Sequence, residues 1–120
     1  MKRTDENIIV VKSKAFALRC IRLYQILAKE RGEYVLSKQL LRSGTSIGAN
    51  VKEAIRGQLK ADFGAKMNIA LKEASESEYW IELLGESEII AHNEFESIIN
   101  DCRSLIKILT SIVKTTFENK

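Results

Sequence analysis

The sequence predicts an all-α protein that folds as one antiparallel, up-down-up-down four-helix bundle. Three observations support this fold class. The 120 residues include no proline and only six glycines, so few residues interrupt a helix. Apolar residues recur at alternating spacings of three and four along four long segments, which is the period of a helix face. The segments are separated by short connections, which are typical of antiparallel neighbours, and a chain of this length (1–120) fits a single domain.

The first predicted helix covers residues 9–31. Basic residues in its last turn and the following Gly32 indicate a helix C-terminus, because cations and glycine are both favoured there. Its apolar face consists of Phe16, Cys20, Leu23 and Leu27.

The second predicted helix covers residues 35–59, and its apolar stripe includes two glycines. Each glycine weakens a helix by roughly 1 kcal/mol relative to alanine. We therefore expect a kink or break between Ser43 and Gly48. This glycine-containing run lacks the Gly-Lys-Ser/Thr ending of a phosphate-binding loop.

The third predicted helix covers residues 62–87, with Asp62 as its N-cap. The middle of its apolar stripe is small, at Ala70, Ala74 and Ser77. Small residues allow close approach of another backbone, and the second helix is the natural candidate.

The fourth predicted helix covers residues 94–117, with Asn93 as N-cap and Glu96 completing a capping box. It carries two apolar rows, whereas a bundle core requires only about three positions in seven. The second row, which predicts burial against another subunit, contains Ile99, Ile106, Val113 and Phe117.

The sequence contains no recognisable catalytic, cofactor or metal site. Helical di-metal sites use Glu-x-x-His pairs, but the only histidine, His92, has Ile89 three positions before it. We expect His92 to flank the fourth helix and Cys20 and Cys102 to be buried thiols. No signal peptide is visible and no stretch approaches the ~18 apolar residues of a membrane span. We therefore expect a cytoplasmic, non-enzymatic protein without a cofactor or small-molecule ligand.

Charge is segregated along the chain. Residues 1–72 contain 15 Lys/Arg and 6 Asp/Glu, whereas residues 73–101 contain 9 Asp/Glu and no Lys/Arg. On the first helix, four cations fall within a sector of about 100° and predict a basic stripe. These residues are Lys12, Arg19, Arg22 and Lys29. The stripe has three interpretations: contact with nucleic-acid phosphates, a solvated helix face, or pairing with the acidic face of another subunit.

A second polar set is predicted between the second and third helices. Residues at helical spacing on one side are Arg42, Ser46, Asn50 and Glu53, and those on the other are Glu73, Ser77 and Trp80. Charged pairing between these faces would fix the register of the two helices. The alternative is an exposed polar face without a structural role.

The stretch LSKQLLRSGTSIGANVKEA at residues 36–54, followed by KEASESEYWIELL at 72–84, resembles the four-helix-bundle family of the 23S rRNA intervening-sequence proteins. Many relatives read Asn-Ile-Ala-Glu-Gly where this chain has Asn50-Val51-Lys52-Glu53-Ala54, and the proline common near Gly48 is absent. The resemblance implies a ring-shaped homopentamer and no established activity. A protein similar in fold, the accessory variability protein of diversity-generating retroelements, binds nucleic acid and a reverse transcriptase through a basic surface.

These observations favour a non-catalytic, oligomeric binding or scaffold protein that contacts RNA or DNA through a basic face. The alternative is a protein-only interaction module whose segregated charges serve homo-oligomer assembly.

Overall fold

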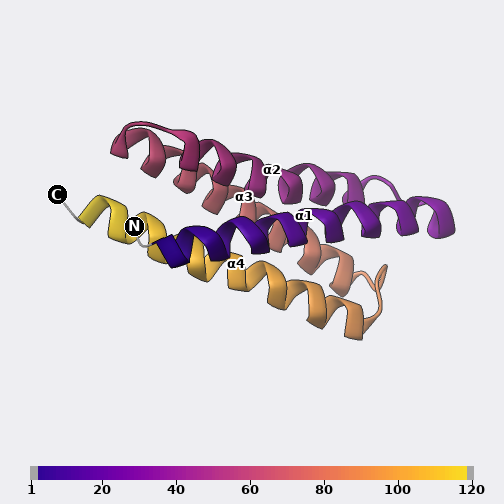
Figure 1. The fold of residues 1–120 in the computed structure, drawn as a ribbon. Coiled ribbons are helices and arrows are strands. Elements are labelled where there is room, and N and C mark those ends of the chain that lie inside the picture. Colours follow the sequence, from indigo (N-terminus) through magenta and orange to yellow (C-terminus); the bar gives the residue numbers. More distant parts are fainter. Residues whose placement is uncertain (1–2, 119–120) are drawn as a thin grey trace.

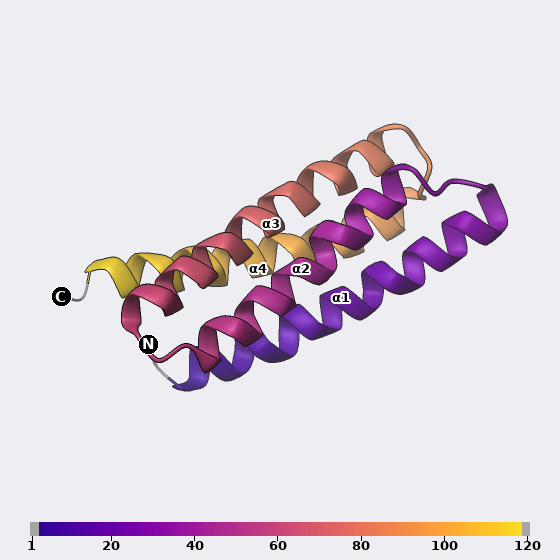
Figure 2. The same cartoon turned by 90° about the horizontal axis from the view of Figure 1, so that it is seen from above.

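Four long helices account for nearly all of the chain. The computed structural model describes residues 3–118, and for residues 3–6 it describes only the backbone. The helices are α1 (Arg3–Arg31), α2 (Leu36–Arg56), α3 (Lys60–Glu86) and α4 (His92–Glu118). Consecutive helices run in opposite directions and lie along one long axis (Figures 1 and 2). The molecule measures 49 × 20 × 19 Å, and the predicted four-helix bundle is confirmed.

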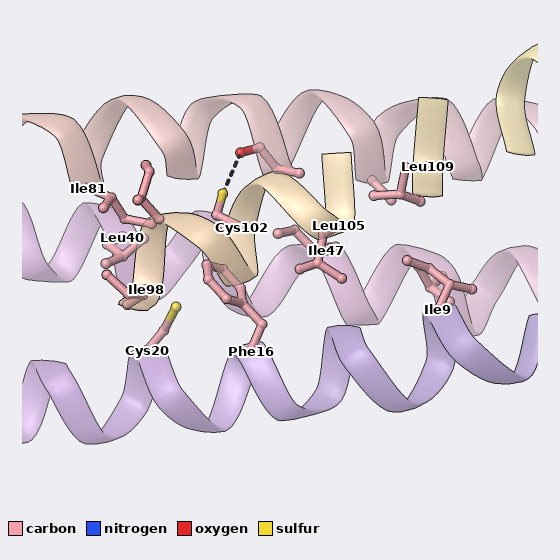
Figure 3. Packing of buried hydrophobic residues seen from close by; sticks show 14 of the residues in the cluster. Ile9, Phe16, Cys20, Leu40, Ile47, Ile81, Ile98, Cys102, Leu105 and Leu109 are labelled. Carbon is pink, nitrogen blue, oxygen red and sulfur yellow. Dashed lines mark hydrogen bonds between the residues drawn. The ribbon is translucent and has the colours of Figure 1, made fainter. Parts of the chain in front are cut away.

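All four helices contribute to one hydrophobic core (Figure 3). The predicted apolar faces provide most of its members: in Figure 3, for example, Phe16 of α1 lies beneath Leu105 of α4, and Ile9 lies beneath Leu109. Both leucines are fully buried, as their place on the strongest apolar stripe predicts. Helix α2 packs most extensively with α3, and the small residues predicted for this contact are buried there.

The end of α1 follows the sequence prediction, but its beginning does not. Gly32 adopts a left-handed conformation with φ of 63°, which glycine accepts without steric cost. The next residue, Glu33, donates its backbone N–H to the Leu27 carbonyl at 3.0 Å. Helix α1 begins at Arg3 instead of residue 9, because no proline or glycine interrupts the polar segment that precedes the apolar stripe.

Helix α2 begins with a cap that sequence reasoning missed. The Glu33 carboxylate accepts the backbone N–H groups of Val35, Leu36 and Ser37 at 2.9–3.0 Å. In return, the Ser37 hydroxyl donates to the Glu33 carbonyl at 3.0 Å. This reciprocal arrangement satisfies N–H groups that have no partner within the helix.

The predicted break between Ser43 and Gly48 is wrong, because α2 is continuous from Leu36 to Arg56. The hydroxyls of Thr45 and Ser46 donate to carbonyls one turn earlier, each at 2.7 Å, instead of capping an interrupted helix. Both glycines face α1, and Gly44 lies against Cys20. These glycines therefore serve close helix packing.

The predicted N-caps of the last two helices are also wrong. Helix α3 begins at Lys60 after a short connection, so Asp62 lies within its first turn and no side chain caps it. Helix α4 begins at His92, which places Asn93 inside the helix; Phe95 N–H bonds to the Ala91 carbonyl at 2.9 Å. In both cases backbone hydrogen bonds extend the helix upstream of the residue with the best capping side chain.

The turn between α3 and α4 depends on a contact from α1. Glu88 has φ of 62°, a left-handed conformation that follows the end of α3. The next N–H, from Ile89, bonds to the Leu84 carbonyl at 3.0 Å. The Arg31 guanidinium, at the end of α1, donates to the carbonyls of Glu88 and Ile89. The end of α1 therefore holds this turn against the bundle.

The second apolar row of α4 is covered mostly within the molecule. Ile99 is fully buried, and Ile106 and Val113 pack half-buried against the core. Phe117 is half-exposed, but its ring lies over Gly64. Packing of α4 against both α1 and α3 accounts for most of this row, and burial of its remaining exposed area against another subunit stays a prediction.

Candidate binding surfaces

The four cations of the predicted basic stripe occupy two different environments. Lys12 donates to the Ser104 hydroxyl of α4 at 3.3 Å. Arg19 pairs with two acids of α4, Glu94 at 2.5 Å and Asp101 at 2.8 Å. In contrast, Arg22 and Lys29 are exposed and form no ion pair with any side chain that the structure describes.

Arg19 serves mainly to connect α1 to α4. Its side chain is only 28% exposed. Burial alone lowers the pKa of the guanidinium, but the hydrogen bonds and negative charges of Glu94 and Asp101 outweigh burial and raise that pKa. Arg19 is therefore a structural cation, whereas Arg22 and Lys29 of the predicted stripe form no side-chain hydrogen bond or ion pair with the described residues.

The exposed side of α1 changes from apolar to basic along its length. Val11 and Leu18 are 66% and 55% exposed, although both are large aliphatic residues. Arg22 and Lys29 follow at spacings of four and seven, so all four lie on one side of the helix. We call Val11, Leu18, Arg22 and Lys29 the outer stripe. Two large aliphatic residues and two cations without an ion-pair partner among the described residues thus share the outward side of α1.

Most acids of the stretch 73–101 form ion pairs inside the molecule, although three arginines compensate only part of their negative charge. Six of its nine acids pair with three arginines that come from the other helices. The pairs are Arg19 with Glu94 and Asp101, Arg42 with Glu73 and Glu76, and Arg103 with Glu78 and Glu82. Segregation along the sequence therefore becomes pairing between adjacent helices.

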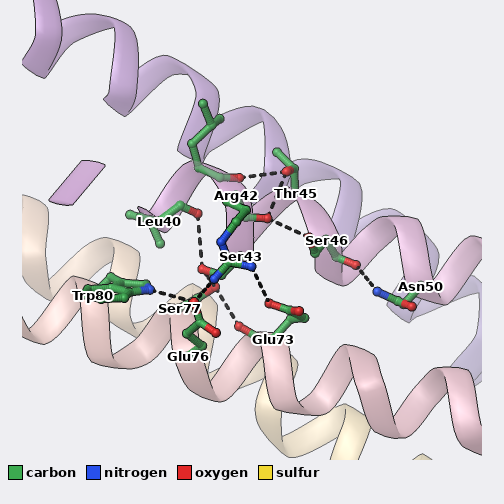
Figure 4. A network of polar contacts seen from close by, with 11 residues as sticks. Leu40, Arg42, Ser43, Thr45, Ser46, Asn50, Glu73, Glu76, Ser77 and Trp80 are labelled. Atoms are coloured by element: carbon green, nitrogen blue, oxygen red, sulfur yellow. Dashed lines mark hydrogen bonds and ion pairs between the residues drawn. The ribbon is translucent and has the colours of Figure 1, made fainter. Parts of the chain in front are cut away.

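The predicted polar set lies between α2 and α3, and its centre is Arg42 (Figure 4). The guanidinium lies 3.6 Å from the Glu73 carboxylate and makes a closer ion pair with Glu76. The Trp80 indole N–H also donates to Glu76, at 3.0 Å. One Glu73 oxygen is buried without a hydrogen bond among the described residues.

Ser43 adds a buried polar contact to this set. The hydroxyls of Ser43 and Ser77 lie 2.8 Å apart in the centre of the α2–α3 contact. Ser77 also donates to the Glu73 carbonyl at 2.9 Å. Sequence reasoning missed Ser43, which looks like a small core residue, and Glu76, whose signal is its position four residues before Trp80.

The remaining members of the predicted polar set do not bridge to Glu73. Ser46 bonds to the Arg42 carbonyl, and Asn50 bonds to the Ser46 carbonyl at 2.8 Å, within α2. Glu53 reaches α3 at a different place, where it pairs with Lys66 at 2.9 Å. Of the seven predicted residues, four therefore belong to one cross-helix cluster, two bond within α2, and Glu53 forms a separate pair with Lys66.

The groups most suited to bond-making chemistry are two buried thiols and one exposed histidine. Cys20 and Cys102 are free thiols, and burial raises the pKa of each to about 12, which keeps both protonated at neutral pH. The exposed His92 opens α4, where it neighbours the Phe95 ring. Across residues 3–118, no group of three or more His, Cys, Asp or Glu residues has an arrangement that could hold a metal ion.

None of the four helices within this range is long and apolar enough to cross a membrane.

The fold and these surfaces define a small antiparallel four-helix bundle protein whose described ion pairs join neighbouring helices. The sequence profile described as 23S rRNA-intervening sequence protein matches residues 5–111. The chain belongs to this family. No curated protein matches the chain.

A solved structure shares both the sequence and the fold. It is the crystal structure of a protein with unknown function from the S23 ribosomal protein family of Bacteroides thetaiotaomicron. The two sequences are 53% identical, and the match covers 92% of this chain and 98% of the other, with a TM-score of 0.89.

Proposed function

We propose that the protein is a non-catalytic, oligomeric binding protein that contacts RNA or DNA. It assembles through the apolar half of the outer stripe, and its basic half meets the nucleic acid. The observation that carries this proposal is the outer stripe itself, in which exposed aliphatic residues continue directly into unpaired cations. The resemblance of the sequence to ring-forming bundles supports a homopentamer. The two buried free thiols are compatible with a cytoplasmic location.

Apolar exposure on α1 favours assembly through this helix. Val11 and Leu18 lie one heptad apart, which is about 10 Å along the helix axis, and Ile8 is exposed beside them. Burying this exposed aliphatic area would contribute a favourable free energy of roughly 25 cal/mol per Å². Other subunits of the same chain would cover it repeatedly in a closed ring.

The assembly proposal is tested by the mass of the protein in solution. Light scattering is expected to report a mass near five subunits for the wild type. Val11→Lys with Leu18→Lys should lower this mass, because each introduces a charge into the proposed contact. Leu59→Lys is the matched control, since Leu59 is equally exposed but lies between α2 and α3. A wild-type monomer at micromolar concentration would contradict assembly.

The distribution of charge favours an anionic partner. Arg22, Lys29 and further cations of α1 and α2 have no described ion-pair partner, so positive charge on these two helices is left uncompensated. The phosphates of RNA and DNA provide the complementary charge without requiring base-specific contacts. A ring would repeat these cations and strengthen weak contacts through effective concentration.

The nucleic-acid proposal is tested by titrating mixed-sequence RNA and DNA at several salt concentrations. The logarithm of affinity should fall linearly with the logarithm of salt concentration, because phosphate contacts release counterions. Arg22→Glu with Lys29→Glu should abolish binding without changing the oligomer mass, whereas Lys72→Glu on α3 should change it little. Arg19 is left intact, since its loss would disturb α4. Absence of binding at about 50 mM salt would contradict the proposal.

The alternative function, a protein-only module assembled by opposite charges, is less well supported. Such assembly needs an acidic face that is free to meet another subunit, but most of that face is paired internally. The two functions differ in their salt dependence. Assembly by charge should weaken as salt is raised, whereas assembly through Val11 and Leu18 should persist.

A further inference from the structure

A groove between α1 and α2 lies to one side of the outer stripe. Its volume is about 460 Å³. Small and aliphatic residues form its floor, and three cations surround it. The floor includes Val10, Ala17, Gly48, Ala49 and Ile55, and the cations are Lys14, Lys52 and Arg56.

The groove exists because α1 and α2 meet through small residues. A Cβ atom on Gly48 would lie 3.6 Å from the backbone carbonyl carbon and oxygen of Ser13, so α2 is in ordinary van der Waals contact with the α1 backbone here. Ala17 and Ala49 leave the space above this contact unfilled. Val10 and Ile55 border it and are 41% and 37% exposed, so the protomer leaves aliphatic surface open there.

The charges around the groove are all of one sign. Lys52 and Arg56 are one turn apart on α2, and Lys14 approaches from α1. No acidic residue is among the described residues that line the groove. None of the three cations forms an ion pair with a described side chain.

We propose that this groove binds an acidic amphipathic helix of a partner protein. Apolar side chains spaced three and four apart would cover Val10 and Ile55, and small residues such as Ala49 would let the helix backbone approach closely. Glu or Asp residues flanking that apolar face would reach the three cations. A helix in this position would cover the exposed aliphatic surface of the groove and place negative charges beside its unpaired cations.

The lining favours a helix over nucleic acid. Proteins that hold single strands provide aromatic side chains on which bases stack, and no aromatic residue lines this groove. Phosphates would meet the cations but leave the aliphatic floor uncovered. The groove residues Val10 and Ala17 lie about 100° around α1 from Val11 and Leu18, whereas Lys14 lies between the two sides. The groove therefore adjoins the outer stripe, and Val10 and Ala17 are not part of that stripe.

The probe is a fluorescently labelled peptide with leucines at positions i, i+3, i+4 and i+7 and glutamates flanking them. Anisotropy is expected to show saturable binding to the full chain. Lys52→Glu with Arg56→Glu should weaken binding by roughly tenfold or more, as should Ala49→Trp, which fills the groove. Ala49 is exposed, so this substitution leaves the core intact, and circular dichroism verifies the fold. Lys72→Glu, a scrambled peptide of the same composition and a peptide with lysines replacing glutamates are the matched controls.

Three results would overturn the inference: no peptide binding, equal binding of the scrambled peptide, or binding that Ala49→Trp and the charge reversals leave unchanged. Two further results would assign the groove to another occupant and also overturn it. One is a fall in oligomer mass in Ala49→Trp, which would make the groove a contact between copies of the chain. The other is loss of nucleic-acid binding in the groove variants without any peptide binding. Because the outer-stripe variants are separate, these failures remain distinguishable from failure of the proposed function.

Discussion

Gly44 of α2 lies directly against Cys20 of α1. A Cβ atom at position 44 would be 2.5 Å from the Cys20 sulfur and 3.3 Å from its Cβ. Real Cβ atoms do not approach other atoms this closely, so the α1–α2 distance depends on the absence of a side chain at this position. Gly48, one turn later, faces Ser13 with more space.

The two glycines are therefore expected to respond oppositely to alanine. Gly44→Ala should destabilise the protein by about 1–2 kcal/mol, because overpacking exceeds the gain in helix propensity. Gly48→Ala should stabilise it by about 0.5–1 kcal/mol, because its nearest contacts are ordinary ones. Chemical denaturation measures both. Adding Cys20→Ala should recover part of the loss in Gly44→Ala, and a strictly additive double variant would disprove the proposed clash.

The core prediction concerns Leu105 and Leu109, which are buried at the centre of the bundle. Replacing either by alanine should lower the free energy of unfolding by about 2–5 kcal/mol, through lost burial and the cavity that remains. The exposed Leu59 supplies a control, whose change to alanine should cost less than about 0.5 kcal/mol. A similarly small loss at Leu105 or Leu109 would be incompatible with their place in the core.

The Glu33 cap makes stability depend on pH. Burial raises the pKa of this carboxyl, but hydrogen bonds from Leu36, Ser37 and Val35 outweigh burial and lower that pKa below its ordinary value. Because the pKa is lower in the folded state, the carboxylate stabilises the fold above the unfolded-state pKa of about 4.3. This contribution disappears as pH falls through the lowered folded-state pKa.

Glu33→Gln should accordingly cost about 1 kcal/mol at neutral pH, the typical value of a lost helix cap. The difference from the wild type should shrink in acid, because wild-type Glu33 then becomes protonated. Denaturation of both proteins across a pH series measures this convergence, and Glu30→Gln serves as an exposed control. A difference that stays constant down to pH ~2 would show that the carboxylate charge has no role in the cap.

The contributions of Arg42 and Glu76 to the free energy of unfolding should be coupled. The Glu76 carboxylate pairs with the Arg42 guanidinium and also accepts a hydrogen bond from the Trp80 indole N–H. A double-mutant cycle with alanine substitutions is expected to show a coupling energy of about 0.5–1 kcal/mol, since the pair is partly exposed. The cycle for Arg42 and Glu73, which are 3.6 Å apart, should give a smaller value. Additivity within about 0.3 kcal/mol in both cycles would favour an exposed polar face without a structural role.

Local sequence information was sufficient for the fold class, the four helices and most of the core. Helical periodicity is a property of neighbouring residues, so the stripe through Leu105 and Leu109 identifies a buried face without knowledge of the partner helix. Gly32 was similarly recognisable, because the left-handed conformation at a helix end depends on the backbone of one residue.

Partner choice required the three-dimensional arrangement. Gly44 reads locally as a weak point in a helix, and its role appears only when Cys20 lies opposite it. The sequence places Arg19 on a basic stripe with Arg22. In the structure Arg19 instead pairs with Glu94, which is 75 residues away in the sequence. Helix capping also depended on the three-dimensional arrangement. Glu33 caps α2 because of the geometry of the α1–α2 turn, whereas Asn93 lies inside α4 because that helix begins at His92. Propensities and periodicity act over a few residues, whereas packing and charge pairing depend on distances between helices that no local pattern encodes.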